Sequence, residues 1–527
     1  MSARRRLHFT LTAPLVSVAL VAVLSAAAGG PSTGGQRQYL PAIGQPNVIV
    51  IVADDLDDKL MRYLPNVRRL IGERGAELTD YYVEQSTCCT SRASIFSGRY
   101  AHNHGVEANT WPKGGFDVWK RTGESNALPT WLHAAGYRNA MMGKYFNQYP
   151  FHLSIKATPT EKKELATYVP PGWDDWVAAV RGNPYAQYHY QLNVNGVVDR
   201  GFRRAYLDEV LGKRAVSLVS GAHGFDFAAG GQFLYYAPYS PHHPYAHPAR
   251  YATQFSSVRY PRTPSFDEAD VSDKFGMTRT KKRLTVTQKK AIDRAFRERI
   301  RSVQVLDRNV GRLVGALQTQ GALDNTYLVF TSDNGYNMGE HRREIGKYNQ
   351  FQEALSVPLY VRGPGIRPGT RIHDLTGNID LAPTVAAMAG ASAPADVDGL
   401  SLLPRLTGAR RSLPRSSLLI GRALIPTNRR SSSPVDEAPE EFVARAKTSR
   451  LNDFSGVVTR RYKLVRYTHL PHEEFYDLKK DPYELTNLLA RDGSSYRAMS
   501  PALRRKVREL RRSIDALVDC AGPTCRR

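Results

Sequence analysis

Cysteine is scarce in this chain of 527 residues, which has only four, arranged as two close pairs. Cys520 and Cys525 enclose the short segment CAGPTC and can bridge each other locally. Cys88 and Cys89 are adjacent, and adjacent cysteines rarely bond to each other because the geometry is strained. The two pairs are therefore expected to have different roles, with Cys88 and Cys89 outside any disulfide.

Acidic residues are also in short supply: 49 Asp and Glu stand against 73 Lys and Arg, for a net charge of +24. With 42% hydrophobic and 23% charged residues the composition is that of a globular protein, long enough for two packed domains. The excess of positive charge favours polyanionic partners. No zinc-finger spacing or aromatic–basic module is present, so nucleic acid is not an expected partner.

The N-terminus has the pattern of a secretory signal peptide. Arg4 to Arg6 are followed by an apolar stretch over residues 9–25 and by the small residues Ala26 to Ala28. No cysteine follows the apolar stretch, which excludes a lipoprotein anchor; an uncleaved membrane anchor is the alternative. We expect a signal peptide over 1–28, a linker over 29–45, and a secreted protein of the extracellular or cell-envelope space without a stable membrane span.

Four apolar runs, over residues 47–53, 232–240, 326–335 and 357–363, each end in polar or glycine-rich residues, as buried parallel strands do. A long periodic segment over 289–321 predicts a helix. Strands that alternate with helices predict an α/β sandwich around a large, mostly parallel sheet, over residues 46–405. Residues 150–230 read as irregular loops around a cleft. Residues 406–527 predict a smaller α+β domain, with a loop over 431–441, an antiparallel sheet and a terminal helix near 500–518.

Two acidic pairs follow predicted strands. Asp54 and Asp55 end the first strand, and Asp333 and Asn334 end another. Ligands of open α/β sheets collect at the carboxyl ends of strands, and four oxygen-bearing side chains suit a hard cation such as Ca²⁺ or Mg²⁺. Either pair alone is as easily explained by helix capping or a turn, but two pairs at one sheet edge favour the metal site.

The segment CCTSRASIFSG predicts a loop that enters a helix, where backbone N–H groups and the helix dipole favour an anion. Arg92 adds a guanidinium that can bind oxyanions in a bidentate manner. Lys144 and Lys347 occur in Gly-Lys dipeptides, and His242 follows a predicted strand. Each alone suits a surface lysine or a turn histidine, whereas together they place cations around a metal and a nucleophile.

These motifs resemble the type I sulfatase signature, C-x-P-S-R followed by a short helix and T-G-R. Here the segment reads Cys88-Cys89-Thr90-Ser91-Arg92 and then SGRY, and only Cys88 has Arg four residues later. NVIVIVADD, GKYFNQY, SPHHPY, FTSDNGYNMGEHR, VPLYVRGPGI, GNIDLAPTV and EEFYDLKKDPYELTNL resemble further sulfatase blocks in the expected order. GKYFNQY, YQLNVNGVVDRG and PRTPSFDEADVSDK are most similar to the N-acetylglucosamine-6-sulfatase-like branch. Thr90 stands where the signature has Pro or Ala, and Phe146 where many members have His.

The resemblance implies an alkaline-phosphatase-like fold and a sulfatase that uses calcium. It implies that a maturation enzyme converts Cys88 to formylglycine, whose hydrate attacks sulfur and later expels sulfate. The implied ligands of Ca²⁺ (with Mg²⁺ as the alternative) are Asp54, Asp55, Cys88, Asp333 and Asn334. Among the other implied site residues, Arg92 steadies the formylglycine, and Lys144 and Lys347 bind sulfate oxygens. His242 assists the leaving alkoxide together with Lys347. The implied substrate-binding residues are Asn147 and His341.

The expected function is hydrolysis of sulfate monoesters on sulfated sugars or glycans, such as a glycosaminoglycan, which the positive charge also favours. One alternative is a phosphate or phosphonate ester hydrolase of the same superfamily, although such enzymes more often use two metals or a Thr nucleophile. A second alternative is a non-catalytic protein that binds acidic glycans, for which loss of a ligand would be the sign. No ligand position is lost here.

Overall fold

The computed structural model describes residues 44–150, 159–201, 204–276, 278–422, 453–489 and 494–526. The described residues belong to one compact unit, Tyr39–Arg527. The expected signal peptide, most of the linker and the loop over 431–441 lie outside the described residues. Within the described part, no helix combines the length and the apolar character that a membrane span requires.

A ten-stranded sheet forms the centre of this unit, in the order β11-β2-β10-β9-β1-β8-β4-β5-β6-β7. The run from β9 through β1, β8 and β4 to β5 is parallel, while β10 and β6 pair antiparallel with their neighbours in this run. The strands are β1 Asn47–Ala53, β2 Ala76–Leu78, β4 Arg138–Gly143, β5 Asp175–Asn183, β6 Tyr188–Val194, β7 Val197–Asp199, β8 Gln232–Ala237, β9 Thr326–Ser332, β10 Leu359–Arg362 and β11 Thr370–Ile372.

Strand β1 shows why this sequence forms a buried central strand. Its β-branched residues suit a pleated surface, and all of its residues are buried. Side chains alternate across the sheet, so Val48 and Val50 lie in one hydrophobic core and Ile49 and Ile51 in the other. Each such side chain contributes about 1.5 to 3 kcal/mol through burial. The strand is thus held in register from both faces.

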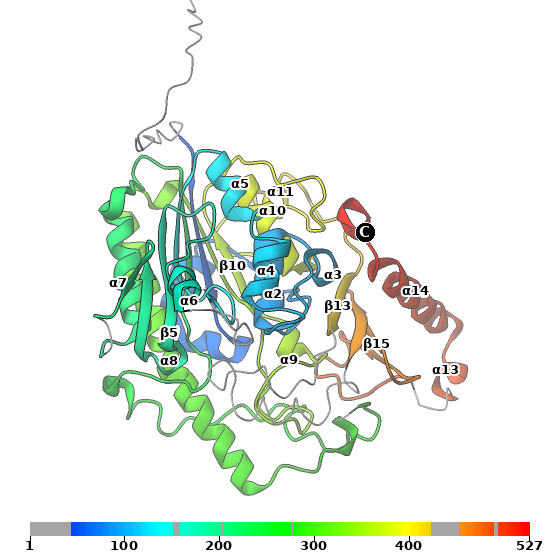
Figure 1. Ribbon diagram of the computed structural model, residues 1–527. Helices are drawn as coiled ribbons and strands as arrows, with labels where there is room; N and C mark the ends of the chain where they lie inside the picture. Colours follow the sequence, from blue (N-terminus) through cyan, green and yellow to red (C-terminus); the bar gives the residue numbers. More distant parts are fainter. Residues whose placement is uncertain are drawn as a thin grey trace, which may run out of the picture. The chain divides into compact units, whose positions relative to one another are not determined.

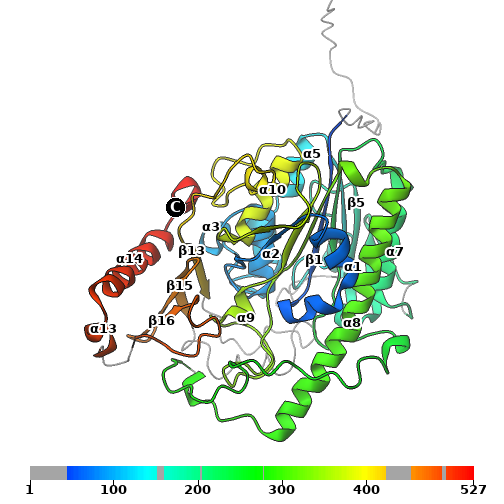
Figure 2. The same cartoon turned by 180° about the vertical axis from the view of Figure 1, so that it is seen from behind.

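Helices cover both faces of the sheet, which makes a three-layer sandwich (Figures 1 and 2). One face carries α2, α5 and α10, and the other carries α1, α7 and α8, as the two cores show. The principal helices are α1 Pro65–Val67, α2 Cys88–Ser97, α4 Phe116–Thr122, α5 Leu128–Ala134, α7 Leu207–Val219, α8 Val286–Thr319 and α10 Leu381–Met388. Shorter elements are α3 Ala101–His104, α6 Pro159–Ala166, α9 Gln352–Leu355, α11 Leu403–Leu406, β3 Tyr81–Tyr82 and β12 Thr376–Gly377.

The long helix predicted over 289–321 is confirmed as α8. It begins at a capping box, in which Gln288 N donates to Thr285 Oγ1 (3.2 Å) and Thr285 N donates to Gln288 Oε1 (2.9 Å). Its apolar stripe, which includes Phe296 and Ile300, is buried against the sheet. Arg299 lies between these two residues and is also fully buried, a position at which an arginine needs a partner.

The expected C-terminal sheet is confirmed as an antiparallel sheet in the order β13-β14-β15-β16, on which α14 packs. Its elements are β13 Leu418–Arg422, β14 Phe454–Val458, β15 Tyr462–Tyr467, β16 Glu473–Asp477, α13 Ser494–Ala498 and α14 Pro501–Leu517.

Cys520 and Cys525 form the expected local disulfide. The backbone N–H of Gly522 donates to Asp398 (2.7 Å), whose own N–H donates to Gly98 O (2.9 Å) at the end of α2. The division at residue 406 stays a prediction.

Two expectations about the chain are wrong. The run over 357–363 is predicted to be parallel, but β10 is antiparallel to β9, so the large sheet is mixed. Residues 150–230 are predicted to be irregular, but they contain β5, β6, β7, α6 and α7. Strand β7 has only three residues, and the apolar run of β5 ends at Arg181 and Gly182, so these strands give a weak local signal. Pairing with β4 and with one another is what forms them.

Candidate active site

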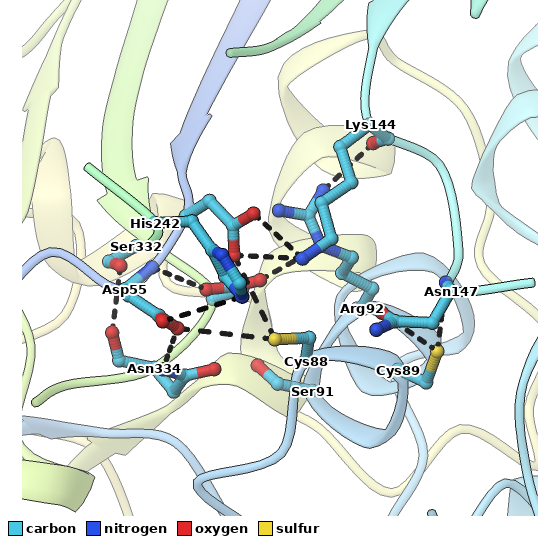
Figure 3. A network of polar contacts seen from close by, with 12 residues as sticks. Asp55, Cys88, Cys89, Ser91, Arg92, Lys144, Asn147, His242, Ser332 and Asn334 are labelled. Atoms are coloured by element: carbon cyan, nitrogen blue, oxygen red, sulfur yellow. Dashed lines mark hydrogen bonds and ion pairs between the residues drawn. The ribbon is translucent and has the colours of Figure 1, made fainter. Parts of the chain in front are cut away.

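The predicted cation-binding and catalytic side chains meet at the carboxyl ends of the parallel strands (Figure 3). Asp54 and Asp55 follow β1, and Asp333 and Asn334 follow β9. Lys144 follows β4, and His242 comes five residues after the end of β8. All six side chains are buried. The parallel run of strands therefore gathers residues that are far apart in the sequence at one edge.

Cys88 occupies the first position of α2, so its side chain lies at the positive end of the helix dipole. Its Sγ accepts a hydrogen bond from Lys347 Nζ at 2.8 Å and lies 3.8 Å from Asp54 Oδ1 and 4.0 Å from Asp55 Oδ1. Cys88 and Cys89 both lie outside the disulfide. A nucleophile at position 88 thus lies between a lysine and two carboxylates.

The carboxylates of the site are paired with cations from three segments. Lys144 Nζ donates to both carboxylate oxygens of Asp54 (2.9 and 2.7 Å). Arg92 Nε donates to Asp333 Oδ2 at 2.9 Å, and its Nη1 donates to Lys144 O at 2.8 Å. Lys347 Nζ also donates to Asp55 Oδ1. These bonds fix the positive groups around the space beside Cys88.

Burial and charge set the protonation states. Burial raises the pKa of Asp54 to about 7, with the neighbouring Asp333 and Asp55 adding to the effect of burial and Lys144 opposing it. Burial would also raise the pKa of Asp55, but Lys347, His242 and Lys144 outweigh it and hold that pKa below its usual range. Burial raises the pKa of the Cys88 thiol well above its ordinary value, although Lys144 and Lys347 pull it down. An unmodified thiol here would be a poor nucleophile at neutral pH.

His242 is held as a neutral imidazole. Burial lowers its pKa to about 3, against the opposing charge of Asp55. Its Nδ1 lies 2.7 Å from His243 O and must donate to that carbonyl, so the lone pair is on Nε2. Nε2 lies 3.8 Å from Asp55 Oδ2 and faces the cluster. His242 Nε2 can therefore accept a hydrogen bond in the site.

The donor set fits a hard divalent cation. Two buried oxygens, Asp55 Oδ2 and Asn334 Oδ1, have no hydrogen-bond partner, a costly state that a cation would relieve. Ligand atoms of Asp54, Asp55, Cys88 and His242 lie within 4.8 Å of one another. Burial is the largest cause of the raised pKa of Asp54, the neighbouring Asp333 and Asp55 add to it, and a bound cation would lower this pKa.

Arg299 is part of this site although no motif contains it. Asp55 has a φ of 68°, in the left-handed region that non-glycine residues rarely adopt. Its N–H donates to Asp333 Oδ1 (3.1 Å), and its carbonyl accepts a hydrogen bond from Arg299 Nη2. Asp57 holds the same guanidinium through Nη1 at 2.6 Å. Arg299 therefore stabilises the unusual backbone conformation of Asp55.

Replacing Arg299 by Met should lower the free energy of unfolding by about 3 to 5 kcal/mol, because Asp57 is left as a buried charge without its partner. Denaturant unfolding measures this change. The double variant Arg299→Met, Asp57→Asn should recover part of the loss. A single Arg299→Met variant as stable as the parent protein would contradict the role assigned to this pair.

Asn147 and His341 lie in different surroundings. Asn147 is next to Cys89, with its backbone N 3.1 Å from Cys89 Sγ. His341 is fully buried in a separate cluster: its Nδ1 lies 2.7 Å from Glu268 Oε2, and its ring stacks on Phe351. None of the described contacts of His341 reaches the carboxylates around Cys88.

Comparison with known proteins identifies the family of this chain. The Sulfatase family profile matches residues 46–391, and a profile described as N-sulphoglucosamine sulphohydrolase, C-terminal, matches residues 440–513. The chain belongs to the sulfatase family. It is a sulfuric ester hydrolase, which favours the enzyme over the non-catalytic alternative.

A human N-acetylglucosamine-6-sulfatase is 31% identical to this sulfatase over 500 residues, which cover 92% of this chain and 86% of the relative. Solved structures share the fold. One is described as a complex with its substrate D-glucosamine-2-N,6-O-disulfate (TM-score 0.66, 21% identity, 89% of this chain and 97% of that chain covered). Another is a phosphonate monoester hydrolase from Silicibacter pomeroyi (TM-score 0.65, 21% identity, 90% and 97% covered). The sulfatase thus has the expected alkaline-phosphatase-like fold.

Sequence reasoning missed several residues around the site of this sulfatase. Arg299 could have been found, because it interrupts the apolar stripe of α8. Asn109 gave no signal: its Oδ1 accepts from Cys89 N (2.9 Å), and its Nδ2 donates to Tyr348 OH (2.9 Å), beside Lys347. That link joins α2 to two loops and depends on tertiary packing alone.

Proposed function

We propose that this sulfatase hydrolyses sulfate monoesters of sulfated sugars or glycans, with Cys88 converted to formylglycine by a maturation enzyme and with Ca²⁺ as its metal. The observation that carries the proposal is the convergence of Lys347, Asp54 and Asp55 on Cys88 Sγ at the start of α2. The name of the human relative and the net charge of +24 support a sulfated sugar as substrate.

The side chains around Cys88 have distinct tasks in this proposal. Lys144 and Lys347 bind the oxygens of the sulfate group, because both ammonium groups face the space beside Cys88. Arg92 holds Asp333 and steadies the group at position 88 from one turn further along α2. Lys347 donates a proton toward the leaving alkoxide. His242 assists the leaving alkoxide together with Lys347, and its Nε2, which carries a lone pair, can accept a hydrogen bond there.

The proposed ligands of the calcium ion are Asp54, Asp55, Asp333, Asn334 and the modified side chain at position 88. When bound, the cation would neutralise charge on the sulfate group and lower the pKa of the nucleophile. The formylglycine hydrate would supply the oxygen that attacks sulfur. The residues of the chain orient these groups and exclude water, since the side chains named here are buried.

Location and chain organisation remain part of the proposal. The N-terminal pattern over 1–28 and the disulfide between Cys520 and Cys525 support secretion into an oxidising space. We retain residues 46–405 as the catalytic domain, residues 406–527 as the C-terminal subdomain and His341 as a proposed substrate-binding residue.

Rates on matched esters test this function. For N-acetylglucosamine 6-sulfate and an aryl sulfate, kcat/KM should exceed the values for the corresponding phosphate monoesters and phosphonates by about 10³-fold, because the chain is a sulfuric ester hydrolase and its site contacts should favour the transition state of sulfuryl transfer. The phosphate and phosphonate esters are included because a phosphonate monoester hydrolase shares the fold. Faster hydrolysis of the phosphonate would overturn the assignment in favour of that chemistry.

A further inference from the structure

Cys89, the neighbour of the proposed nucleophile, is positioned to act on the reaction through another residue. It is the second residue of α2 and is fully buried. Successive helical side chains point in directions about 100° apart. Cys88 therefore faces the carboxylates, while Cys89 faces the loop that follows β4 and carries Asn147 (Figure 3).

The thiol of Cys89 holds Asn147 at two points. The backbone N–H of Asn147 donates to Cys89 Sγ at 3.1 Å. The S–H of Cys89 has an acceptor in Asn147 Oδ1 at 3.4 Å, with Asn109 O further away at 3.7 Å. A thiol can accept and donate at once, so it fixes both the backbone and the carboxamide of Asn147.

This arrangement leaves the other end of the carboxamide facing the site. Asn147 Nδ2 is buried and has no hydrogen-bond partner, and the residue is only 2% exposed. In Figure 3 a dashed line joins this carboxamide to Cys89, and its nitrogen lies on the side toward Cys88. A buried NH₂ group without an acceptor is costly, and such groups in native proteins call for an explanation. An oxygen of a bound ligand beside Cys88 would satisfy it.

We propose that Cys89 is a positioning residue, whose thiol orients Asn147 so that Nδ2 donates a hydrogen bond to an oxygen of the sulfate ester. The inference rests on the proposed function, since it takes the sulfate group to lie beside position 88. Cys89 itself does not touch the substrate. Its backbone N–H donates to Asn109 Oδ1 at 2.9 Å, which holds the start of the helix that carries the thiol.

Two variants separate orientation from simple filling of space. Cys89→Ala removes the thiol, which both donates and accepts a hydrogen bond. Cys89→Ser keeps a group that can donate and accept, and its side chain is close in size to that of alanine. Cys89→Ala should lower kcat/KM on a sulfate monoester about 10-fold, and Cys89→Ser should keep it within about 3-fold of the parent, as for groups that orient an active-site residue. A role in packing alone would affect thermal stability in both variants and leave kcat/KM unchanged.

The variant Asn147→Ala shows whether the effect passes through the carboxamide. It should lower kcat/KM about 10- to 100-fold, the loss expected for one donor to a charged oxygen. In the Asn147→Ala background, Cys89→Ala should cause no further loss, because the group that it orients is gone. A Cys89→Ala effect of undiminished size in that background would overturn the inference, and so would a Cys89→Ala variant with the kcat/KM of the parent.

Activity must be expressed per converted site, since position 89 lies inside the segment that a maturation enzyme reads. The fraction of Cys88 converted is measured by peptide mass in each variant, and kcat is divided by it. Binding of inorganic sulfate to the Cys88→Ala protein gives a second readout that needs no nucleophile; Cys89→Ala should weaken this binding about 10-fold. A parent protein without sulfatase activity would defeat the proposed function, whereas sulfate binding unchanged by Cys89→Ala would defeat only this inference.

Discussion

The Cys88→Ala variant loses sulfatase activity by at least about 10⁴-fold in kcat, the loss expected when a covalent nucleophile is removed. Cys88→Ser is expected to fall almost as far. A serine hydroxyl at this position lacks the second hydroxyl of an aldehyde hydrate, so sulfate could leave only after a second attack at sulfur. The measurement is kcat on an aryl sulfate with purified protein.

The adjacent thiol provides the matched control for this experiment. Cys89→Ser changes the same chemical group one residue away and should retain activity within about 3-fold, because it keeps the hydrogen-bonding pattern. The thermal midpoints of the Cys88 variants should stay near that of the parent. If Cys88→Ala kept more than about 1% of the parent kcat, the nucleophile would have to be another group.

Removing divalent cations has the second large effect. After chelation, sulfatase activity should fall by at least about 10³-fold, since no cation then stabilises charge at the sulfate group. Adding Ca²⁺ should restore it. The thermal midpoint should rise with Ca²⁺ concentration, because binding to the folded state alone stabilises by about 2.7 kcal/mol at a hundred times Kd. Mg²⁺ added alone tests the other cation that this donor set suits.

A pair of variants ties that effect to the proposed ligands. Asp55→Asn should abolish the shift of the thermal midpoint with Ca²⁺, because it removes the charge of a proposed ligand whose Oδ2 has no hydrogen-bond partner. Asp307→Asn is the control: this carboxylate binds the N–H groups of Asn66 and Val67 at 2.8 and 3.0 Å and makes no contact with the site. It should lower stability and keep the full shift. An Asp55→Asn protein that still responds to Ca²⁺ would remove Asp55 from the ligand set.

The sequence is informative where structure follows from local patterns. Continuous apolar runs predict the buried strands, and the carboxyl ends of parallel strands share one edge, so the order of residues alone places Asp54 and Asp333 together. The helix α8 is predictable from its period. The loop-to-helix pattern predicts a helix start near Ser91, close to the observed start at Cys88. The resemblance to the sulfatase signature, through the spacing to Arg92, distinguishes Cys88 from Cys89.

Other features depend on contacts that no local pattern encodes. Strands β5 to β7 form because they pair with β4 and with one another, and their residues show no regular alternation that would predict them. The link from Cys89 through Asn109 to Tyr348 joins three segments through side chains. His341 belongs to a conspicuous motif, yet its ring packs against Phe351 and bonds to Glu268, away from the carboxylates. Motif membership therefore does not fix where that side chain points.

The mass of the peptide that spans residues 85–100 tests the central claim most directly. In protein made by its native secretion route, this peptide should be about 18 Da lighter than its sequence requires, because an aldehyde has replaced the thiol at position 88. Thr90, which stands where the signature has Pro or Ala and is fully buried, makes the result informative about maturation as well. An active protein whose peptide retains both thiols intact would contradict the mechanism proposed for Cys88.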